Sequence, residues 1–299
     1  MVSVIIPAYN EARVIGRLLS QLVPTAAPPG QPDDLDVIVV ANGCTDDTAK
    51  VAASFGPAVR VVSIPVASKR AALVAGDEAA LGFPRIYVDA DVEVRTGDMR
   101  ALGAALLQPG VLAVAPEREL ALTDRTWLVR WYYDVWTRLP EIRQGLFGRG
   151  VVGVSEAGHK RIASLPPLLG DDLAASLSFT PQERAIVPGT RVVVHPPRTI
   201  ADLLRRRVRA AVVVTQIERA QAEGVRIGAA PGLTARTRPT DLLAIARSGP
   251  GMAARVAVFV AVAVIARARA RRAVARGDFS TWLRDQSSRL ACRARTDGA

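Results

Sequence analysis

Two aspartates separated by one small residue, Asp89-Ala90-Asp91, are the sharpest chemical feature of the sequence. They follow the apolar run Ile86–Val88, which is typical of a buried strand. Alternate residues of an extended chain point to the same side, so the pair can present two carboxylates at the edge of a sheet. Hard oxygen ligands of this kind suit magnesium or manganese bridging a diphosphate. The pattern D-x-D is common by chance, and its position after a strand gives it weight.

Polar side chains also follow the two strands predicted before it, Ser3–Ile6 and Asp36–Ala41. Ligands of parallel sheets bind beyond the carboxyl ends of the strands, so the residues just after each strand are the candidates for binding. Those residues are Pro7, Tyr9, Asn10 and Glu11 after the first strand, and Asn42 and Asp46 after the second. Together with the aspartates they predict one ligand-binding edge.

A cation at that edge would have a clear task. When a nucleoside diphosphate departs from a sugar, negative charge develops on oxygens that a metal can neutralise without a proton. Lys69 and Arg70 can add fixed positive charge there, although such a pair also serves as an ordinary solvated helix start. The sequence has no P-loop pattern, and no G-x-G-x-x-G follows the first strand, which excludes P-loop and dinucleotide chemistry.

A second acidic pair, Asp171-Asp172, precedes a helix-like stretch. These carboxylates either cap that helix or supply a general base that takes the proton of an attacking hydroxyl. His195, one of two histidines, ends an apolar strand-like run. It is either structural or a metal ligand, and the sequence leaves both readings open.

These residues depend on a sheet to position them. Over the first 120 residues, short β-branched runs alternate with helical periods, which is typical of βαβ units and a parallel sheet. Further strands are predicted at Val59–Ile64 and Ile86–Val88. A helix capped by Asn10 is predicted to end before Pro24, and another to open after NGCTDDT. The apolar face of the first helix consists of Ile15, Leu18, Leu19 and Leu22.

The segment Thr126–Leu139 is also predicted to be helical and holds three of the four tryptophans. Leu128, Tyr132, Val135 and Leu139 would share one side. Such a stripe is more typical of a core, yet Trp and Tyr also stack on sugars, so the helix is either core or an acceptor wall.

Composition limits the class of protein. The 299 residues are 49% hydrophobic, which is enough for a large packed core. Cys44 and Cys292 are the only cysteines, so neither a disulfide framework nor a zinc site is predicted, and the reducing cytoplasm is the expected compartment. The first residues lack the pattern of a secretory signal.

The net charge of +11 is unevenly distributed. Residues 1–195 carry 19 basic and 21 acidic residues, whereas residues 196–299 carry 20 arginines, no lysine and 7 acidic residues. The arginine clusters are not interleaved with aromatic residues, so nucleic acid is not expected as a partner. This change in composition and charge predicts a sheet-containing domain at 1–230 and a basic helical extension at 231–299, joined through the linker-like PGLTARTRPT.

Within the extension, the apolar run Val256–Ala266 precedes RARARR. Its eleven residues cannot span a hydrocarbon layer that needs about 20. A short apolar helix beside arginines is either a peripheral anchor on the anionic inner face of the cell membrane or a core helix packed on the domain.

Six segments in this order resemble the family 2 glycosyltransferases of the GT-A fold. That fold is an α/β structure with a Rossmann-like, mostly parallel sheet flanked by helices, followed here by the arginine-rich helical extension. The segments, within residues 1–210, are VSVIIPAYNE, NGCTDDT, SKRAALVAG, YVDADV, GRGVVGVSEAG and GDDLAAS. The resemblance implies an inverting transferase of the hexosyltransferase type that uses a nucleotide-sugar donor and a divalent metal, magnesium or manganese.

The resemblance also implies roles for individual residues. Asp172 would be the catalytic base, beside Asp171. The metal would be held by Asp91, with Asp89 and His195. The nucleotide-sugar would contact a larger set: Pro7, Tyr9, Glu11, Asn42, Asp46, Lys69 and Asp89.

The sequence departs from the family pattern after the second strand, where Ala41-Asn42 replaces a pair of aspartates. Asparagine lacks the charge that the paired donors of guanine favour, so a uridine or thymidine diphosphate sugar is expected rather than a guanosine diphosphate sugar. Asp171 likewise replaces a glutamate. The shape of the loop Gly148–Gly158 is expected to determine which acceptor is used. An acceptor carried on a lipid would suit the basic extension.

Two alternatives remain open. A nucleotidyltransferase acting on sugar phosphates would use a similar sheet and metal, but it needs a glycine-rich basic signature near the first strand, which PAYNEA lacks. A non-catalytic homologue would bind the nucleotide-sugar without transferring the sugar.

Overall fold

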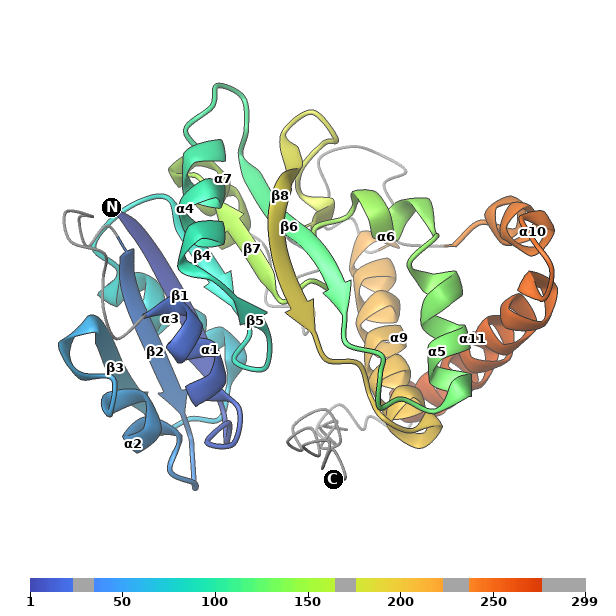
Figure 1. Ribbon diagram of the computed structural model, residues 1–299, viewed down its shortest axis with the longest axis horizontal. Helices are drawn as coiled ribbons and strands as arrows, with labels where there is room; N and C mark the ends of the chain where they lie inside the picture. The colour runs from blue at the N-terminus through green and yellow to red at the C-terminus, as the bar shows by residue number, and fades with distance from the viewer. Residues whose placement is uncertain (24–34, 165–175, 223–236, 276–299) are drawn as a thin grey trace, which may run out of the picture.

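The computed structural model describes residues 1–23, 35–164, 176–222 and 237–275, and Figure 1 shows a sheet-containing part joined to a layer of helices. The strands are β1 (Val2–Ala8), β2 (Leu35–Asn42), β3 (Val59–Ile64), β4 (Arg85–Val88), β5 (Glu93–Val94), β6 (Ala113–Leu120), β7 (Val151–Val154) and β8 (Arg184–Val194). The helices are α1 (Ile15–Leu22), α2 (Thr48–Ala53), α3 (Lys69–Ala79), α4 (Thr96–Ala105), α5 (Trp127–Trp136), α6 (Pro140–Gln144), α7 (Glu156–Ala163), α9 (Ile200–Ala222), α10 (Pro239–Arg247) and α11 (Met252–Ala275).

The described strands form one sheet in the order β3-β2-β1-β4-β7-β6-β8-β5. The first four strands are parallel, as predicted, and β6 is parallel to β8. Strand β7 runs against both β4 and β6, and β5 runs against β8. The carboxyl ends of β1, β2, β4, β6 and β8 therefore lie along one edge of the sheet.

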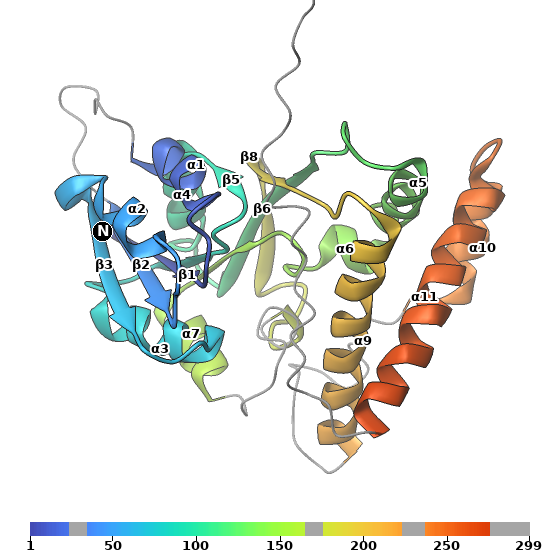
Figure 2. The same cartoon turned by 90° about the horizontal axis from the view of Figure 1, so that it is seen from below.

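Two layers of helices enclose the parallel strands, with α1 and α4 on one face and α3 and α7 on the other (Figure 2). Alternate residues of β1 point to opposite sides: Val4 and Ile6 pack under α1, whereas Ile5 packs against Ala72 of α3. Burial on both faces explains why these strands are continuously apolar.

Helix α1 buries Ile15, Leu18, Leu19 and Leu22, which confirms its predicted apolar face. The predicted cap was wrong, because the helix begins only at Ile15 and its first residues receive no side-chain cap. Asn10 instead adopts a left-handed backbone with φ of 51°, and its side chain binds Thr45 in the loop after β2.

Helix α5 belongs to a second core formed with α6, α9, α10 and α11. Val129, Tyr132, Tyr133 and Trp136 are its buried residues at helical spacing, together with Val135. The prediction that Leu128 shares this face was wrong, since Leu128 is half-buried and Val129 is fully buried. Most of the aromatic stripe is therefore core, although Trp127 is 58% exposed.

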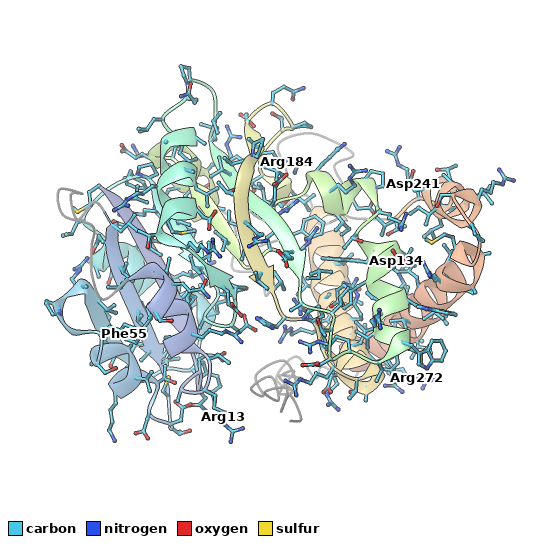
Figure 3. The ribbon with its side chains drawn as sticks, in the orientation of Figure 1. Arg13, Phe55, Asp134, Arg184, Asp241 and Arg272 are labelled. Carbon is cyan, nitrogen blue, oxygen red and sulfur yellow. The ribbon has the colours of Figure 1, made fainter. Side chains whose placement is uncertain are left out.

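Helix α11 packs along α5 and α9 (Figure 2). The ring of Phe259 stacks on Tyr132 at 5.0 Å, and Arg255 pairs with Asp134, which lies on α5 beside α11 (Figure 3). One face of the run Val256–Ala266 is thus core, while Val260, Val264 and Ile265 on its other side stay exposed. Among the residues that the structure describes, no helix combines the length and the hydrophobicity of a membrane span.

The turn that enters β7 requires glycine at position 150. Gly150 has φ of +70°, and a β-carbon there would lie 2.5 Å from Val92 Cγ1 and 3.3 Å from Asp89 Oδ2. Its carbonyl accepts a hydrogen bond of 2.7 Å from the backbone N–H of Asp89. The glycine therefore allows β7 to approach the Asp89-Ala90-Asp91 segment closely.

We expect Gly150→Ala to lower the free energy of unfolding by more than Gly189→Ala does. Gly189 has a similar φ of +77° but no atom within 4 Å of the added carbon, so it measures the strain of the left-handed backbone alone, about 1–2 kcal/mol. The contacts around Gly150 should add about 1–3 kcal/mol. Urea denaturation of both variants measures the difference. Equal losses of unfolding free energy would show that the turn at Gly150 accommodates the added carbon without further destabilisation.

Candidate active site

The edge formed by the carboxyl ends of the strands brings together side chains from distant parts of the chain. Asp89 to Val92 lead from β4 into β5, which pairs with β8. This segment therefore links β4 to a strand that is four places away in the sheet order. It delivers Asp89 beside β7 and carries Asp91 toward the end of β8, where His195 follows Val194.

Asp89 is held from two sides. Its backbone N–H bonds to Gly150, and its Oδ1 lies 2.9 Å from Nζ of Lys69, the first residue of α3. Both side chains are about one-third exposed, at 36% for Asp89 and 34% for Lys69. The structure thus joins two of the predicted residues in an ion pair that solvent and a ligand can reach.

The loops after β1 and β2 are fastened to each other. The side-chain oxygen of Asn10 accepts a hydrogen bond from the backbone N–H of Thr45 at 2.8 Å. Asp46 accepts one from the backbone N–H of Ala12 at 3.1 Å, and Thr48 accepts one from that of Glu11 at 2.8 Å. The predicted nucleotide-binding loops therefore form one continuous polar wall.

The side chains predicted to hold the nucleotide differ in their access to it. Asn42 is 3% exposed and donates to the carbonyl of Ala8 at 2.8 Å, and Glu11 is 5% exposed. Asp46 is exposed, while Pro7 and Tyr9 are half-buried. Hydrogen bonds join the two loops that carry these residues, and the contacts of these residues with a nucleotide stay predictions.

His195 lies in a polar cluster that we did not predict from the sequence. Its Nε2 is 2.6 Å from Oε1 of Glu93, and Nε of Arg17 is 3.2 Å from the same oxygen. Arg17 also donates to the backbone carbonyl of Asp91 at 3.1 Å, and Gln21 donates to Oε2 of Glu93 at 3.1 Å. The one sequence signal for this cluster is the spacing of Glu93, which comes two residues after Asp91 and would share its side of an extended chain.

Burial shifts the protonation of this cluster. It lowers the pKa of His195, and the positive charge of Arg17 lowers that pKa further. Burial opposes the ionisation of Glu93, but the hydrogen bond from His195 and the charge of Arg17 outweigh it and lower the pKa of Glu93. At neutral pH the pair is therefore a neutral imidazole against a carboxylate.

The predicted ligands Asp89, Asp91 and His195 offer the carboxylate and imidazole donors that magnesium and manganese accept. In the described residues, however, no three His, Cys, Asp or Glu side chains already converge on one point. The carboxylate and imidazole donors suit a divalent cation, but in this structure the three side chains do not yet surround a common point. Asp171 and Asp172 lie outside the described residues.

Two arginines, the half-buried Arg118 and the buried Arg149, hold the loop before β7. Arg118 donates to the carbonyls of Gly148 and Ile142, and Arg149 donates to those of Gly145 and Pro116. Burial, with the neighbouring charge of Arg149, lowers the pKa of Arg118 to about 9, so it remains protonated at neutral pH. These bonds fix the turn Gly148–Gly150, whereas the prediction that Gly148–Gly158 is one loop was wrong, because most of this segment is β7 and the start of α7.

Comparison with known proteins agrees with this arrangement. The model of the family "Glycosyl transferase family 2" matches residues 3–156, more than half of the chain. A 4,4'-diaponeurosporenoate glycosyltransferase of Staphylococcus aureus (strain USA300) is 44% identical over 57 residues, which are 19% of this chain and 14% of that protein. The chain thus matches only a small part of that relative.

Solved structures are similar over a larger part of the chain. Glucosyl-3-phosphoglycerate synthase from Mycobacterium tuberculosis, in complex with Mn²⁺, uridine diphosphate and glucosyl-3-phosphoglycerate, has a TM-score of 0.52 and 25% identity, covering 76% of this chain and 81% of that chain. Its complex with Mn²⁺ and uridine diphosphate glucose has a TM-score of 0.51 and 25% identity, covering 76% and 80%. These structures confirm the predicted GT-A type fold, and the family match shows that this chain belongs to glycosyl transferase family 2.

Proposed function

We propose that this protein transfers a sugar from a nucleoside diphosphate sugar, held through a divalent cation, to an acceptor hydroxyl. The observation that supports this most is the edge of the sheet, where Lys69 pairs with Asp89 and the Glu93–His195 cluster is linked through Arg17 to the backbone of Asp91. Acidic, basic and imidazole groups along one rim suit a cation bridged to a diphosphate.

Asp91 and His195 are the proposed ligands of the cation, with Asp89 beside them. A bound Mg²⁺ or Mn²⁺ would stabilise the negative charge of the departing diphosphate. Lys69 would supply a second positive charge from the start of α3, where its ion pair with Asp89 already holds it. The loops after β1 and β2 would receive the nucleoside.

The donor we propose is a uridine diphosphate sugar. The Mycobacterium tuberculosis synthase with a similar fold was solved with Mn²⁺ and uridine diphosphate glucose. Asn42, which stands where the family has an aspartate, agrees with a base that lacks the paired donors of guanine. A thymidine diphosphate sugar would satisfy the same requirement.

For the chemical step we propose one in-line displacement with inversion. Asp172 would take the proton of the acceptor hydroxyl as its oxygen attacks the anomeric carbon and the bond to the diphosphate oxygen breaks. Asp171 would lie beside this base.

We further propose that the outer side of α11 rests on an anionic lipid surface. Val260, Val264 and Ile265 are 39%, 57% and 41% exposed. The next two turns expose Arg267, Arg269, Arg271 and Arg272. Arginines near an anionic surface contribute about 1 kcal/mol each, so apolar and basic surface on one helix favours lipid over water. Such a position would suit a lipid-linked acceptor.

The donor and the cation can be tested together. We expect uridine diphosphate glucose with Mn²⁺ to raise the melting temperature, because a ligand that binds only the folded state stabilises it. Guanosine diphosphate sugars should raise it less, and Asp91→Asn should remove the Mn²⁺-dependent part of the shift. Asp98→Asn, at the first turn of α4, is the matched control. If no nucleotide-sugar in a broad panel raises the melting temperature, the proposed function is wrong.

The base can be tested by its effect on turnover alone. We expect Asp172→Asn to lower kcat by about three or more powers of ten while leaving donor affinity within about twofold, since the base acts only on the acceptor. Steady-state kinetics and calorimetric titration of the donor measure the two quantities. Hydrolysis or transfer at the wild-type rate in this variant would refute the assignment. A wild-type protein that binds the donor but transfers and hydrolyses nothing would identify a non-catalytic homologue.

The lipid surface can be tested by sedimentation with vesicles. We expect binding to phosphatidylglycerol vesicles and little binding to phosphatidylcholine vesicles. Val264→Asp should weaken the former by roughly tenfold, about 1.4 kcal/mol, because it places a charge on the apolar face. Leu107→Asp, at a residue that is 75% exposed beyond the end of α4, is the matched control. Equal binding by both variants would contradict a role for this face.

A further inference from the structure

The cluster around Glu93 combines contacts that a simple surface ion pair does not have. Both carboxylate oxygens are in use: Oε1 contacts His195 and Arg17, and Oε2 accepts from Gln21. The side chains are largely withdrawn from solvent, at 23% exposed for Glu93 and 16% for His195. These contacts join α1, β5 and the end of β8.

The strand register places this cluster beside the D-x-D segment. Glu93 is paired with Val193 and Val94 with Val192 in antiparallel fashion. Continued by two residues, the same register sets Asp91 opposite His195. Asp91 lies in the turn before β5, but burial alternates through it, since Ala90, Val92 and Val94 lie in the core whereas Asp91 and Glu93 are half-buried on the other side. Arg17 strengthens the link, because it contacts Glu93 and also donates to the carbonyl of Asp91.

The contact with Glu93 also decides which ring nitrogen of His195 is available. A carboxylate can only accept a hydrogen bond, so the short contact of 2.6 Å requires the proton to be on Nε2. In the neutral ring, Nδ1 then carries the lone pair and can bind a cation. Metal-binding histidines commonly have their second nitrogen fixed by a carboxylate in this way.

We propose that Glu93 is a positioning residue that fixes the tautomer and orientation of His195 for the cation held with Asp91. The inference rests on the proposed metal-dependent function and adds Glu93 to it, with Arg17 as the group that ties Glu93 to the D-x-D backbone. Glu93 acts through His195 and touches neither donor nor acceptor.

A purely structural role for Glu93 makes a different prediction. If the cluster only fastened α1 to β5, its loss would lower stability and leave the affinity for the cation unchanged in the folded protein. A positioning role requires the cation affinity to fall even where the protein remains folded. The two roles are therefore separated by a binding measurement.

The experiment is a titration of the full-length protein with Mn²⁺ in the presence of uridine diphosphate, following free Mn²⁺ by electron paramagnetic resonance. We expect Glu93→Gln to weaken Mn²⁺ binding by about ten- to a hundredfold, the usual effect of losing the carboxylate behind a metal-binding histidine. Glu119→Gln, which removes an exposed ion pair with Arg191 on the same sheet, should bind Mn²⁺ like the wild type. Thermal melting of each variant confirms that it is folded.

A double-mutant cycle tests whether Glu93 acts through His195. We expect Glu93→Gln to have no further effect on Mn²⁺ affinity in a His195→Ala background, because the residue it orients is gone. Additive losses in the double variant would overturn the inference, as would wild-type or tighter Mn²⁺ binding by a folded Glu93→Gln protein. If the wild type itself bound no Mn²⁺ with uridine diphosphate, the metal site would fail, and the role of Glu93 with it.

Discussion

The central constraint on this structure is the path of the chain between β4 and β5. Four residues after β4, the chain has to enter a strand that pairs with β8, while β7 and β6 lie between β4 and β8 in the sheet. Four connecting residues span at most about 17 Å, which is too short for four strand spacings of about 4.8 Å each, so the sheet has to curl and bring β8 and β5 back toward β4. This segment is held by the hydrogen bond that Asp89 N–H donates to the Gly150 carbonyl and by the one that the Arg17 side chain donates to the Asp91 carbonyl. Its two aspartates therefore stay at the carboxyl end of β4.

The parts of the fold that follow local rules could be predicted from the sequence. The strands β1 to β4 and the buried face of α1 were predicted correctly, because β-branched runs and helical spacing are local signals. The position of Asn10 could not be predicted, since its left-handed backbone depends on a partner 35 residues away. The same reasoning explains the error at Leu128, where the packing of α9 and α11 selects the buried face of α5.

The candidate site was predictable to a similar extent. Residues that follow a strand can be found once the end of the strand is predicted. Two of the candidates found in this region, Lys69 and Asp89, form an ion pair in the structure. The partners of His195 could not be found, because Arg17 and Glu93 reach it from α1 and β5, and no sequence spacing encodes the pairing of β5 with β8. The arginines behind the loop before β7 were missed for the same reason, since they act on backbone carbonyls that carry no sequence signature.

The helical layer has a consequence for how the chain can be divided. Tyr132, Trp136 and Ile142 lie in the middle of the sequence, but their covering residues, Phe259 and Val262, come from the far end. Cutting the chain after residue 230 to obtain a minimal catalytic piece would uncover this aromatic surface, and uncovered surfaces of that kind promote aggregation. We therefore expect a soluble fragment of this chain to need α11, because this helix covers the aromatic residues of α5.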